Sequence, residues 1–241
     1  MIDFDAVETL GGLVVLQRGE DYVALDKPSG MPVHPGLSRE RDTVVARLAA
    51  ALKGPVHLLH RLDRGTSGVL LVADSPVAAA RYGRAFSGSR VDKEYLALVR
   101  GAPPAEILVD HPIPCDEGGA RVSALTLVRT LAVASLEASP LREKRYAVVH
   151  ALPRTGRFHQ VRRHLKHLAH PIVGDTNYGK SEHDRFVRER FGLSRLALHA
   201  SRLVVRDEAG EVLVDVSSPL AEDLRGTLER MGLASWRDLD H

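Results

Sequence analysis

A single carboxylate, Asp63, lies in a short stretch that is otherwise rich in positive charge and in turn-forming residues. The stretch HRLDRGTSG occupies residues 60–68 and leads directly into the apolar run 69–73. Arg61 and Arg64 favour the ionised form of Asp63, because opposite charges within a few ångströms stabilise a carboxylate. An ionised carboxylate can act as a nucleophile or as a general base. Asp63 is therefore the candidate reactive group, and the alternative is a surface turn with an ordinary solvated ion pair.

The glycines and hydroxyl residues of this stretch predict a shaped loop that feeds a buried strand. Gly65 and Gly68 allow backbone conformations that other residues avoid, and Thr66 and Ser67 can hydrogen-bond the local backbone. Ser67 does not stand in a G-x-S-x-G elbow, so the sequence gives serine hydrolysis little support. A P-loop and a dinucleotide-binding fingerprint are also absent from the sequence.

The elements that must position this loop are strands and short helices. Apolar and β-branched runs predict strands, and Ser75-Pro76 is typical of a helix start. The proline-rich segment from Asp26 to Pro35 predicts a rigid loop that can wall a pocket. In the first half we expect a loosely held start over 1–12, strands over 13–16, 22–25 and 69–73, and helices over 44–52 and 76–88.

The second half continues with more strands and one strongly basic helix. Residues 154–170 contain five arginines or lysines and no acidic residue, which is the clearest local excess of charge in the chain. The apolar spacing of Val161, Leu165 and Leu168 predicts a helix over 157–168. We expect strands over 93–99, 107–109, 125–128, 131–136, 145–152, 196–206 and 212–216, an irregular excursion over 102–124, and a last helix after Pro219. This alternation predicts an α+β or mixed α/β fold.

Composition excludes several classes of protein. The chain has 241 residues and a formal net charge of +2, so its net charge alone does not indicate a nucleic-acid partner. Its single cysteine, Cys115, excludes an intramolecular disulfide and a four-cysteine zinc site. Three histidines recur at three-residue steps, namely His164, His167 and His170. On a helix this spacing distributes the side chains around the axis, so they do not converge on one metal ion. No secretory segment or membrane span is visible, so we expect a cytoplasmic protein.

Four blocks of the sequence, in order, resemble the RluA-type pseudouridine synthases. Residues 60–68 match the catalytic signature H-R-L-D-x-x-T-S-G of that family at every fixed position. The other three blocks are DKPSG at 26–30 with His34-Pro35, KEY at 93–95, and TGRFHQVR at 155–162 running on to Gly174-Asp175. A set of this length is far more specific than any one motif. Departures from the family pattern, such as Gly65 and Phe158, bear on substrate contacts more than on chemistry.

The resemblance implies a fold and a domain organisation. The family fold is a long mixed, mostly antiparallel sheet bent around a central catalytic cleft, with flanking helices. It would place the whole chain, 1–241, in a single catalytic domain with a core of about 13–218. Some family members carry an S4 RNA-binding domain, and nothing in this sequence is long enough to be one. The catalytic domain would then bind its RNA unaided.

The resemblance also implies roles for individual residues. Asp63 matches the essential aspartate, Arg162 the arginine that pairs with it, and Tyr95 the tyrosine that stacks on the target base. Whether the aspartate acts as a nucleophile or as a base stays open. Arg61 would fill the space left by an extruded uridine. The further RNA contacts that we expect are His60, Arg64, Arg157, His159, Arg163 and Lys166, and Arg154 is a weaker candidate.

These features predict an RNA uridine isomerase that needs no cofactor, no metal and no obligatory protein partner. The tracts 162–175 and 191–201 resemble family members that act on tRNA, and uridine 65 is the position that this likeness implies. Two alternatives stay open. One is the same reaction on ribosomal RNA, since related members share every motif. The other is a non-catalytic RNA-binding module that keeps the same cleft.

Overall fold

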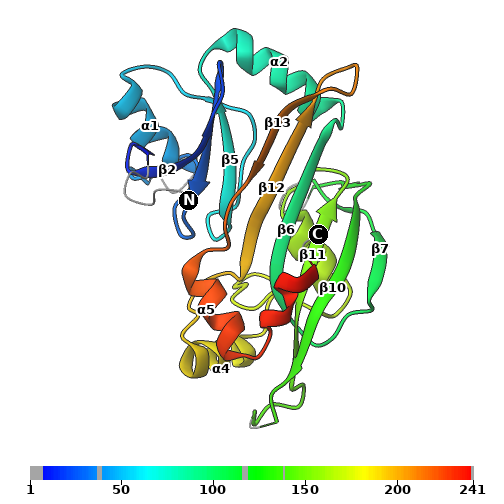
Figure 1. Ribbon diagram of the computed structural model, residues 1–241. Coiled ribbons are helices and arrows are strands. Elements are labelled where there is room, and N and C mark those ends of the chain that lie inside the picture. Colours follow the sequence, from blue (N-terminus) through cyan, green and yellow to red (C-terminus); the bar gives the residue numbers. More distant parts are fainter. Residues whose placement is uncertain (1–7, 37–39, 116–118, 138, 240–241) are drawn as a thin grey trace. The chain divides into compact units, whose positions relative to one another are not determined.

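The structure is a computed structural model that describes residues 8–36, 40–115, 119–137 and 139–239. The chain divides into two compact units (Figure 1), of which the first comprises Met1–Asp92 and Ala200–Pro219. The second comprises Lys93–His199 and Leu220–His241. Residues 1–7 of the expected loose start lie outside the described part of the chain. The single catalytic domain over the whole chain stays a prediction.

The first unit combines a sheet with two helices. Its strands are β1 Thr9–Leu10, β2 Leu13–Arg18, β3 Tyr22–Lys27, β4 His57–Leu58, β5 Ser67–Ala73, β12 Leu198–Arg206, which enters this unit at Ala200, and β13 Val212–Ser217. Its helices are α1 Val44–Leu52 and α2 Pro76–Ser87. The strand order is β1-β2-β3-β5-β12, with β13 beside β12 and β4 beside β5. Strand β3 runs antiparallel to both β2 and β5.

Strand β5 lies in the interior of this sheet, and every one of its residues is buried. Val69, Leu71 and Ala73 join the apolar core of the unit together with Ala78 and Tyr82 of helix α2. The apolar run in the sequence is continuous because this strand is covered on both faces. Helix α2 begins as predicted, because the Ser75 side chain accepts a hydrogen bond from the backbone N–H of Ala78.

The second unit is a second antiparallel arrangement with helices on both faces. Its strands are β6 Val91–Arg100, which enters this unit at Lys93, β7 Glu106–Asp110, β8 Ile113–Pro114, β9 Arg121–Val122, β10 Leu125–Ser135 and β11 Arg145–Pro153. Its helices are α3 Gln160–His167, α4 Ser181–Phe191, α5 Glu222–Arg230 and the 3-10 helix Ala234–Leu239. The order of the large sheet is β6-β11-β10-β7 with antiparallel neighbours, and β8 and β9 form a separate pair.

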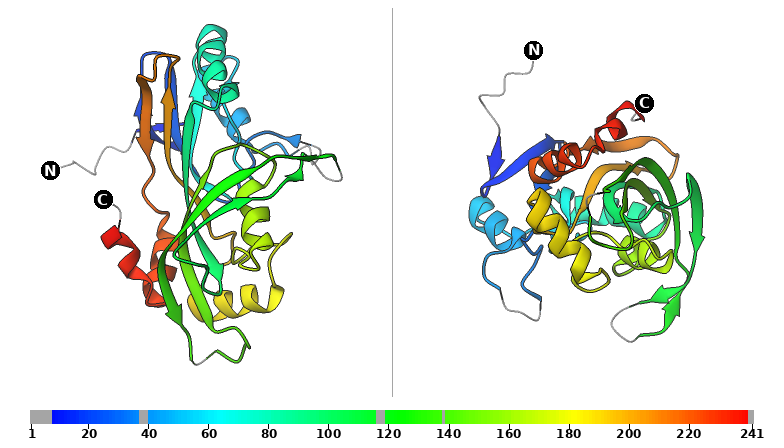
Figure 2. Two further views of the ribbon diagram at one scale, coloured as in Figure 1. Left: turned by 90° about the vertical axis from the view of Figure 1, so that its right-hand side faces the viewer. Right: turned by 90° about the horizontal axis from the view of Figure 1, so that it is seen from below.

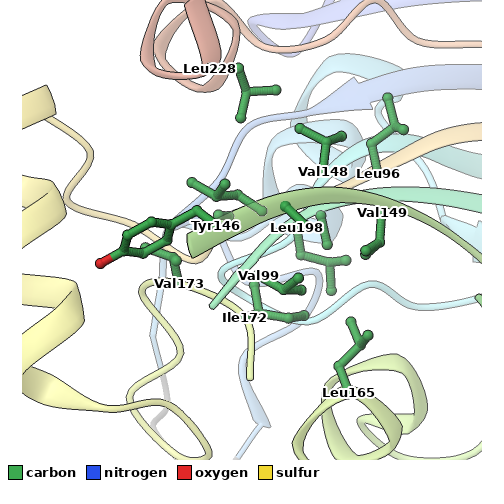
Figure 3. Close-up of a cluster of buried hydrophobic side chains, with 14 of the residues drawn as sticks. Leu96, Val99, Tyr146, Val148, Val149, Leu165, Ile172, Val173, Leu198 and Leu228 are labelled. Atoms are coloured by element: carbon green, nitrogen blue, oxygen red, sulfur yellow. The ribbon is translucent and has the colours of Figure 1, made fainter. Parts of the chain in front are cut away.

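The core of the second unit lies on both faces of strands β6 and β11. Figure 3 shows Leu165 of α3 and Leu228 of α5 on opposite sides of these strands. Val148 and Val149 are consecutive residues of β11 and point to the two faces, as the alternation of a strand requires. The left view of Figure 2 shows the same placement of α3 and α5 about the strands. Helix α3, which carries Arg162, is thus fixed by its apolar face.

The α+β class is confirmed, and most element predictions agree with the structure. The strands predicted over 125–128 and 131–136 are one strand, β10, because a β-bulge between Thr130 and Ala132 absorbs the extra residue without ending the pairing with β11. Helix α3 begins at Gln160 instead of residue 157, because His159 adopts a left-handed conformation with φ 53°. Helix α4 was not predicted. Its signals are Glu182 and Asp184 in the first turn and Gly192 at the C-terminal end.

Candidate active site

Asp63 lies on the loop between β4 and β5, at the point where the chain turns into the buried strand. The backbone N–H of Thr66 donates to the carbonyl of Asp63 over 3.1 Å, which closes a tight turn. Leu62 and Thr66 are buried, whereas Asp63 is half-buried. The apolar side chain on one side and the turn on the other therefore hold this carboxylate at a partly exposed position.

A second loop is tied to this turn by backbone and side-chain hydrogen bonds. The buried ammonium of Lys27, at the end of β3, donates to the carbonyl oxygens of Pro28, Met31 and Arg64 over 2.7, 2.8 and 3.2 Å. The Ser29 hydroxyl donates to the carbonyl of Gly65 over 2.6 Å. The DKPSG and HRLDRGTSG motifs are thus joined in the first unit.

Replacing Lys27 with methionine is expected to loosen both loops. Methionine has a similar length but leaves the carbonyls of Pro28, Met31 and Arg64 without their charged donor. Bonds to charged groups are worth more than neutral ones, so we expect the free energy of unfolding to fall by about 2 to 4 kcal/mol. Chemical denaturation of the two proteins checks this, with Lys53→Met, at the exposed end of α1, as the control. Equal stability of Lys27→Met and wild type would contradict a role for the ammonium.

Gly68 is required where the loop enters β5. Its φ is +107°, and a Cβ at this position would lie 2.1 Å from the carbonyl oxygen of Ala200 in β12. A side chain would thus be strained by the backbone conformation and would also collide with the neighbouring strand. The glycine that ends the signature motif therefore serves the close approach of the two strands.

The three residues of this loop that are predicted to contact RNA have different surroundings. His60 Nε2 accepts a hydrogen bond from the backbone N–H of Leu71 over 3.0 Å, and its ring stacks on Phe86 at 5.3 Å. Arg64 forms an ion pair with Glu40 at 2.8 Å. Arg61 is exposed and makes no hydrogen bond or ion pair with the described residues. Arg61 is therefore the cation of this loop with the greatest freedom to reach a ligand.

Arg162, in the second unit, is buried and held by a bidentate ion pair. Its Nε and Nη2 each donate over 2.8 Å to a different oxygen of Asp175, and Nη2 also lies 3.2 Å from Oδ1 of Asn177. Burial disfavours the charged form of Asp175, but the hydrogen bonds and charge of Arg162 and two backbone N–H groups outweigh it. These interactions hold the pKa of Asp175 below its ordinary value. Asp175 belongs to the Gly174-Asp175 block of the sequence, whereas its contact with Arg162 was not predicted.

Tyr95 lies on β6 beside two charged residues with partners in the same unit. The tyrosine is half-buried and pairs in register with Ala151 of β11. Glu94 accepts from His150 Nε2 over 2.9 Å. Burial lowers the pKa of Lys93, and a Cβ on Gly156 would lie 3.0 Å from its Nζ. The KEY motif and the loop before α3 are therefore adjacent.

The predicted RNA-binding residues around the start of α3 gather about Tyr178, which sequence analysis missed. Its hydroxyl accepts from Arg163 Nε over 2.8 Å and lies 3.1 Å from His159 Nδ1. Lys166 is exposed, with its Nζ 5.6 Å from the centre of the Tyr178 ring. Arg157 is also exposed and donates to a backbone carbonyl over 3.3 Å. These cations share one part of the second unit, as a phosphate-binding surface requires.

His164 is a buried structural residue and not a member of that surface. Its Nε2 lies 3.0 Å from the carbonyl of His111, which can only accept, so Nε2 carries the proton. Its Nδ1 lies 2.9 Å from the hydroxyl of Thr126. Burial lowers the pKa of His164, and burial likewise lowers the pKa of His183 in α4. No group of three or more His, Cys, Asp or Glu within the described ranges could hold a metal ion.

The two buried histidines predict a loss of stability in mild acid. The folded protein keeps both rings neutral, whereas the unfolded chain takes up protons near the ordinary pKa of 6.5. Between pH 6.5 and the lower pKa values of the two histidines in the folded protein, the unfolded state binds more protons than the folded state. The contribution of the two neutral rings to the free energy of unfolding is therefore fully present above pH 6.5 and is lost as the pH falls through this window. Denaturation curves from pH 8 to pH 5 check this, and His164→Gln should flatten the decline. A flat profile in wild type would contradict it.

Comparison with known proteins adds the family. The sequence profile described as RNA pseudouridylate synthase matches residues 21–167. The chain belongs to this family. A protein of Haemophilus ducreyi named tRNA pseudouridine synthase C is 38% identical over 79% of this chain and 84% of that protein. The protein of the same name from Salmonella typhimurium is 36% identical over 94% of this chain and 92% of its own length.

Solved structures of RNA pseudouridylate synthases have the same fold. Human RNA pseudouridylate synthase domain containing 1 superposes with a TM-score of 0.71 at 27% identity, and covers 91% of this chain and 89% of that one. Human RNA pseudouridylate synthase domain containing 4 gives a TM-score of 0.71 at 26% identity. The match covers 90% of this chain and 92% of that one. The predicted pseudouridine-synthase fold is thereby confirmed. As a member of this family the chain is an isomerase that converts uridine to pseudouridine in RNA.

The range of the family match includes some of the site residues described above and not others. Asp63 and Tyr95 and Arg162 fall within the matched range 21–167. Asp175 and Tyr178 lie beyond it, and their roles follow from their contacts alone. No helix in the described segments has both the length and the apolar character needed to cross a membrane.

Proposed function

We propose that this protein isomerises a uridine of tRNA, and that the position is uridine 65. The observation that carries the tRNA substrate is the set of curated relatives named tRNA pseudouridine synthase C, such as those of Haemophilus ducreyi and Salmonella typhimurium. The residues that distinguish this group in the sequence, over 162–175 and 191–201, extend past the family match. The position within the tRNA rests on this likeness alone.

Asp63 is the residue that we propose to act on the nucleotide. The reaction breaks the bond between N1 of uracil and C1′ of the ribose, turns the base, and joins C5 to C1′. The proton on C5 is lost and N1 gains one, so that atoms and electrons balance without a cofactor. An ionised carboxylate can take part by attacking the sugar or the base, or by removing a proton from the sugar. The half-buried position of Asp63 at the loop turn supports access for a ligand.

Arg162 and Tyr95 are proposed to complete the site. A guanidinium keeps its charge under all relevant conditions and can hold the catalytic carboxylate by hydrogen bonds. Tyr95 would stack on the uracil ring and accept or relay the C5 proton. The half-buried environment of Tyr95 on a paired strand supports a fixed ring.

RNA binding is proposed to require extrusion of the target nucleotide. The reaction needs access to the sugar and both edges of the base, so the nucleotide must leave its stack at a cost of a few kcal/mol. Arg61, exposed and without a bond to the described residues, is suited to fill the gap. The further RNA contacts stay predictions, and they are His60, Arg64, Arg157, His159, Arg163 and Lys166. Of these, His60 and Arg64 already interact with Leu71 and Glu40, and RNA binding would either keep or replace these interactions.

Tritium release tests the activity and the substrate together. Transfer RNA transcripts labelled with tritium at C5 of uridine should release the label to water, and a transcript with cytidine at position 65 should not. Release of tritium from ribosomal RNA and not from tRNA would show that the substrate is ribosomal RNA, the first of the two alternatives. Tight RNA binding without release from either RNA would favour the non-catalytic module. Release from tRNA that survives the change at position 65 would overturn the choice of uridine only.

A further inference from the structure

Arg162 is held by a carboxylate of its own unit, that of Asp175. Five N–H groups project from a guanidinium in a fixed plane, so each partner takes a defined edge. In this protein the edge formed by Nε and Nη2 faces the two oxygens of Asp175, each at 2.8 Å. Nη2 also donates to Oδ1 of Asn177 over 3.2 Å.

The turn that follows α3 is built to hold the Asp175 carboxylate still. Oδ1 of Asp175 accepts from the backbone N–H groups of Asn177 and Tyr178 over 3.0 and 3.1 Å, in addition to Nη2 of Arg162. The Asp175 side chain is completely buried, and that of Arg162 is 7% exposed. The Tyr178 ring lies against the guanidinium, with 5.1 Å between its centre and Cζ. A buried polar network whose members are hydrogen-bonded in this way favours a defined geometry of the ion pair.

Gly174 shows that the position of this turn is itself constrained. Its φ is +78°, and a Cβ would lie 2.0 Å from the carbonyl oxygen of Arg195. The backbone N–H of Gly174 donates to Oδ1 of Asp184 in α4 over 2.7 Å. The residue before Asp175 is therefore locked to two other segments of the same unit, so the carboxylate cannot follow the arginine if the arginine moves.

We propose that Asp175 is a positioning residue that fixes the orientation of the Arg162 guanidinium for the reaction. This inference rests on the proposed role of Arg162. Asp175 takes both the Nε and the Nη2 hydrogen bonds of that guanidinium, so loss of its charge would change how Arg162 is oriented without removing the arginine itself.

Asp175→Asn tests the proposal, because asparagine keeps the volume and one acceptor oxygen but removes the charge and one of the two arginine bonds. Single-turnover rates and the dissociation constant are measured with labelled tRNA. We expect kcat to fall about 10-fold to 100-fold, as for a misplaced catalytic group. KM and the dissociation constant should stay within about twofold, since Asp175 makes no contact with RNA in this account. The matched control is Asp184→Asn in helix α4, which keeps an acceptor oxygen for the N–H of Gly174 and changes the net charge by the same amount, and it should keep kcat near wild type.

A second variant distinguishes orientation of Arg162 from simple support of the turn. Asn177 is exposed and its Oδ1 already faces Nη2 of Arg162, so Asn177→Asp in the Asp175→Asn protein returns a carboxylate to the same guanidinium. We expect the double variant to regain at least about threefold in kcat. Thermal melting of each variant verifies that it is folded.

The outcomes separate this inference from the proposed function. A folded Asp175→Asn protein with kcat within about twofold of wild type overturns the inference, as does a loss confined to KM. No gain in kcat by the folded double variant would assign the effect to the turn and also overturn it. If wild type releases no tritium, or Asp63→Asn releases it at the wild-type rate, the proposed function fails instead. Loss in Asp63→Asn with none in Asp175→Asn rejects only the positioning role.

Discussion

Asp63→Asn is expected to abolish pseudouridine formation while leaving the protein folded and able to bind RNA. Asparagine has the same shape but can neither attack the nucleoside nor take a proton, so we expect the rate to fall by about 1000-fold or more. The backbone carbonyl of residue 63 still closes the turn with Thr66, and Leu62 stays buried, so the loop should persist. Tritium release and nuclease mapping of the product measure the rate, and filter binding measures the affinity for tRNA.

Asp74→Asn is the control for this substitution. Asp74 follows the other end of the same strand β5 and is exposed. Its replacement changes the net charge of the protein by the same amount, so a general electrostatic effect on RNA binding would appear in both variants. Activity of Asp63→Asn within about tenfold of wild type would refute the catalytic assignment, because removal of a reacting carboxylate cannot be so mild.

Gly68→Ala should be the most destabilising small substitution near the loop. The added methyl group would lie 2.1 Å from the carbonyl oxygen of Ala200, and φ is +107°. Strand β5 is buried along its whole length, so the collision cannot be relieved toward solvent. We expect a loss of about 3 kcal/mol or more in the free energy of unfolding, which is large compared with a typical point substitution. Urea denaturation gives the number.

Gly30→Ala separates the collision from the backbone strain. Gly30 also has a positive φ, +87°, but a Cβ there meets nothing within 4 Å. Both variants carry the cost of a left-handed alanine, about 1 kcal/mol, and only Gly68→Ala carries the clash. If the two substitutions reduced stability equally, the close approach of β5 and β12 would not be the reason for the glycine.

The sequence was most informative where one local pattern determines one element. The bounds of α1 and the start of α2 at Ser75-Pro76 agree with the structure, because capping and periodicity act over a few residues. The all-apolar run 69–73 identified a buried strand for the same reason. The family was accessible from the four blocks at 26–35, 60–68, 93–95 and 155–175, three of which lie wholly within the range of the family match. The role of Asp63 as the reacting carboxylate stays a prediction.

What the sequence did not reveal depends on contacts between distant positions. Helix α4 buries only a narrow apolar face through His183 and Val187, so its periodicity is weak. The bulge in β10 is defined by its register with β11 and has no local mark. The pairing of Arg162 with Asp175, thirteen residues away, needs the turn after α3 to bring them together. From sequence alone, a charged residue on a basic helix is expected to be exposed to solvent, unless its ion-pair partner is known.

The buried ammonium of Lys27 occupies a cage of carbonyl oxygens from Pro28, Met31 and Arg64. Such a cage is the kind of site in which a potassium or sodium ion replaces its hydration shell by backbone oxygens. Here the cation is tethered covalently to the end of β3, so its local concentration is fixed by the chain and not by the medium. The conformation of the loop that carries Asp63 should therefore be the same in sodium and in potassium salts.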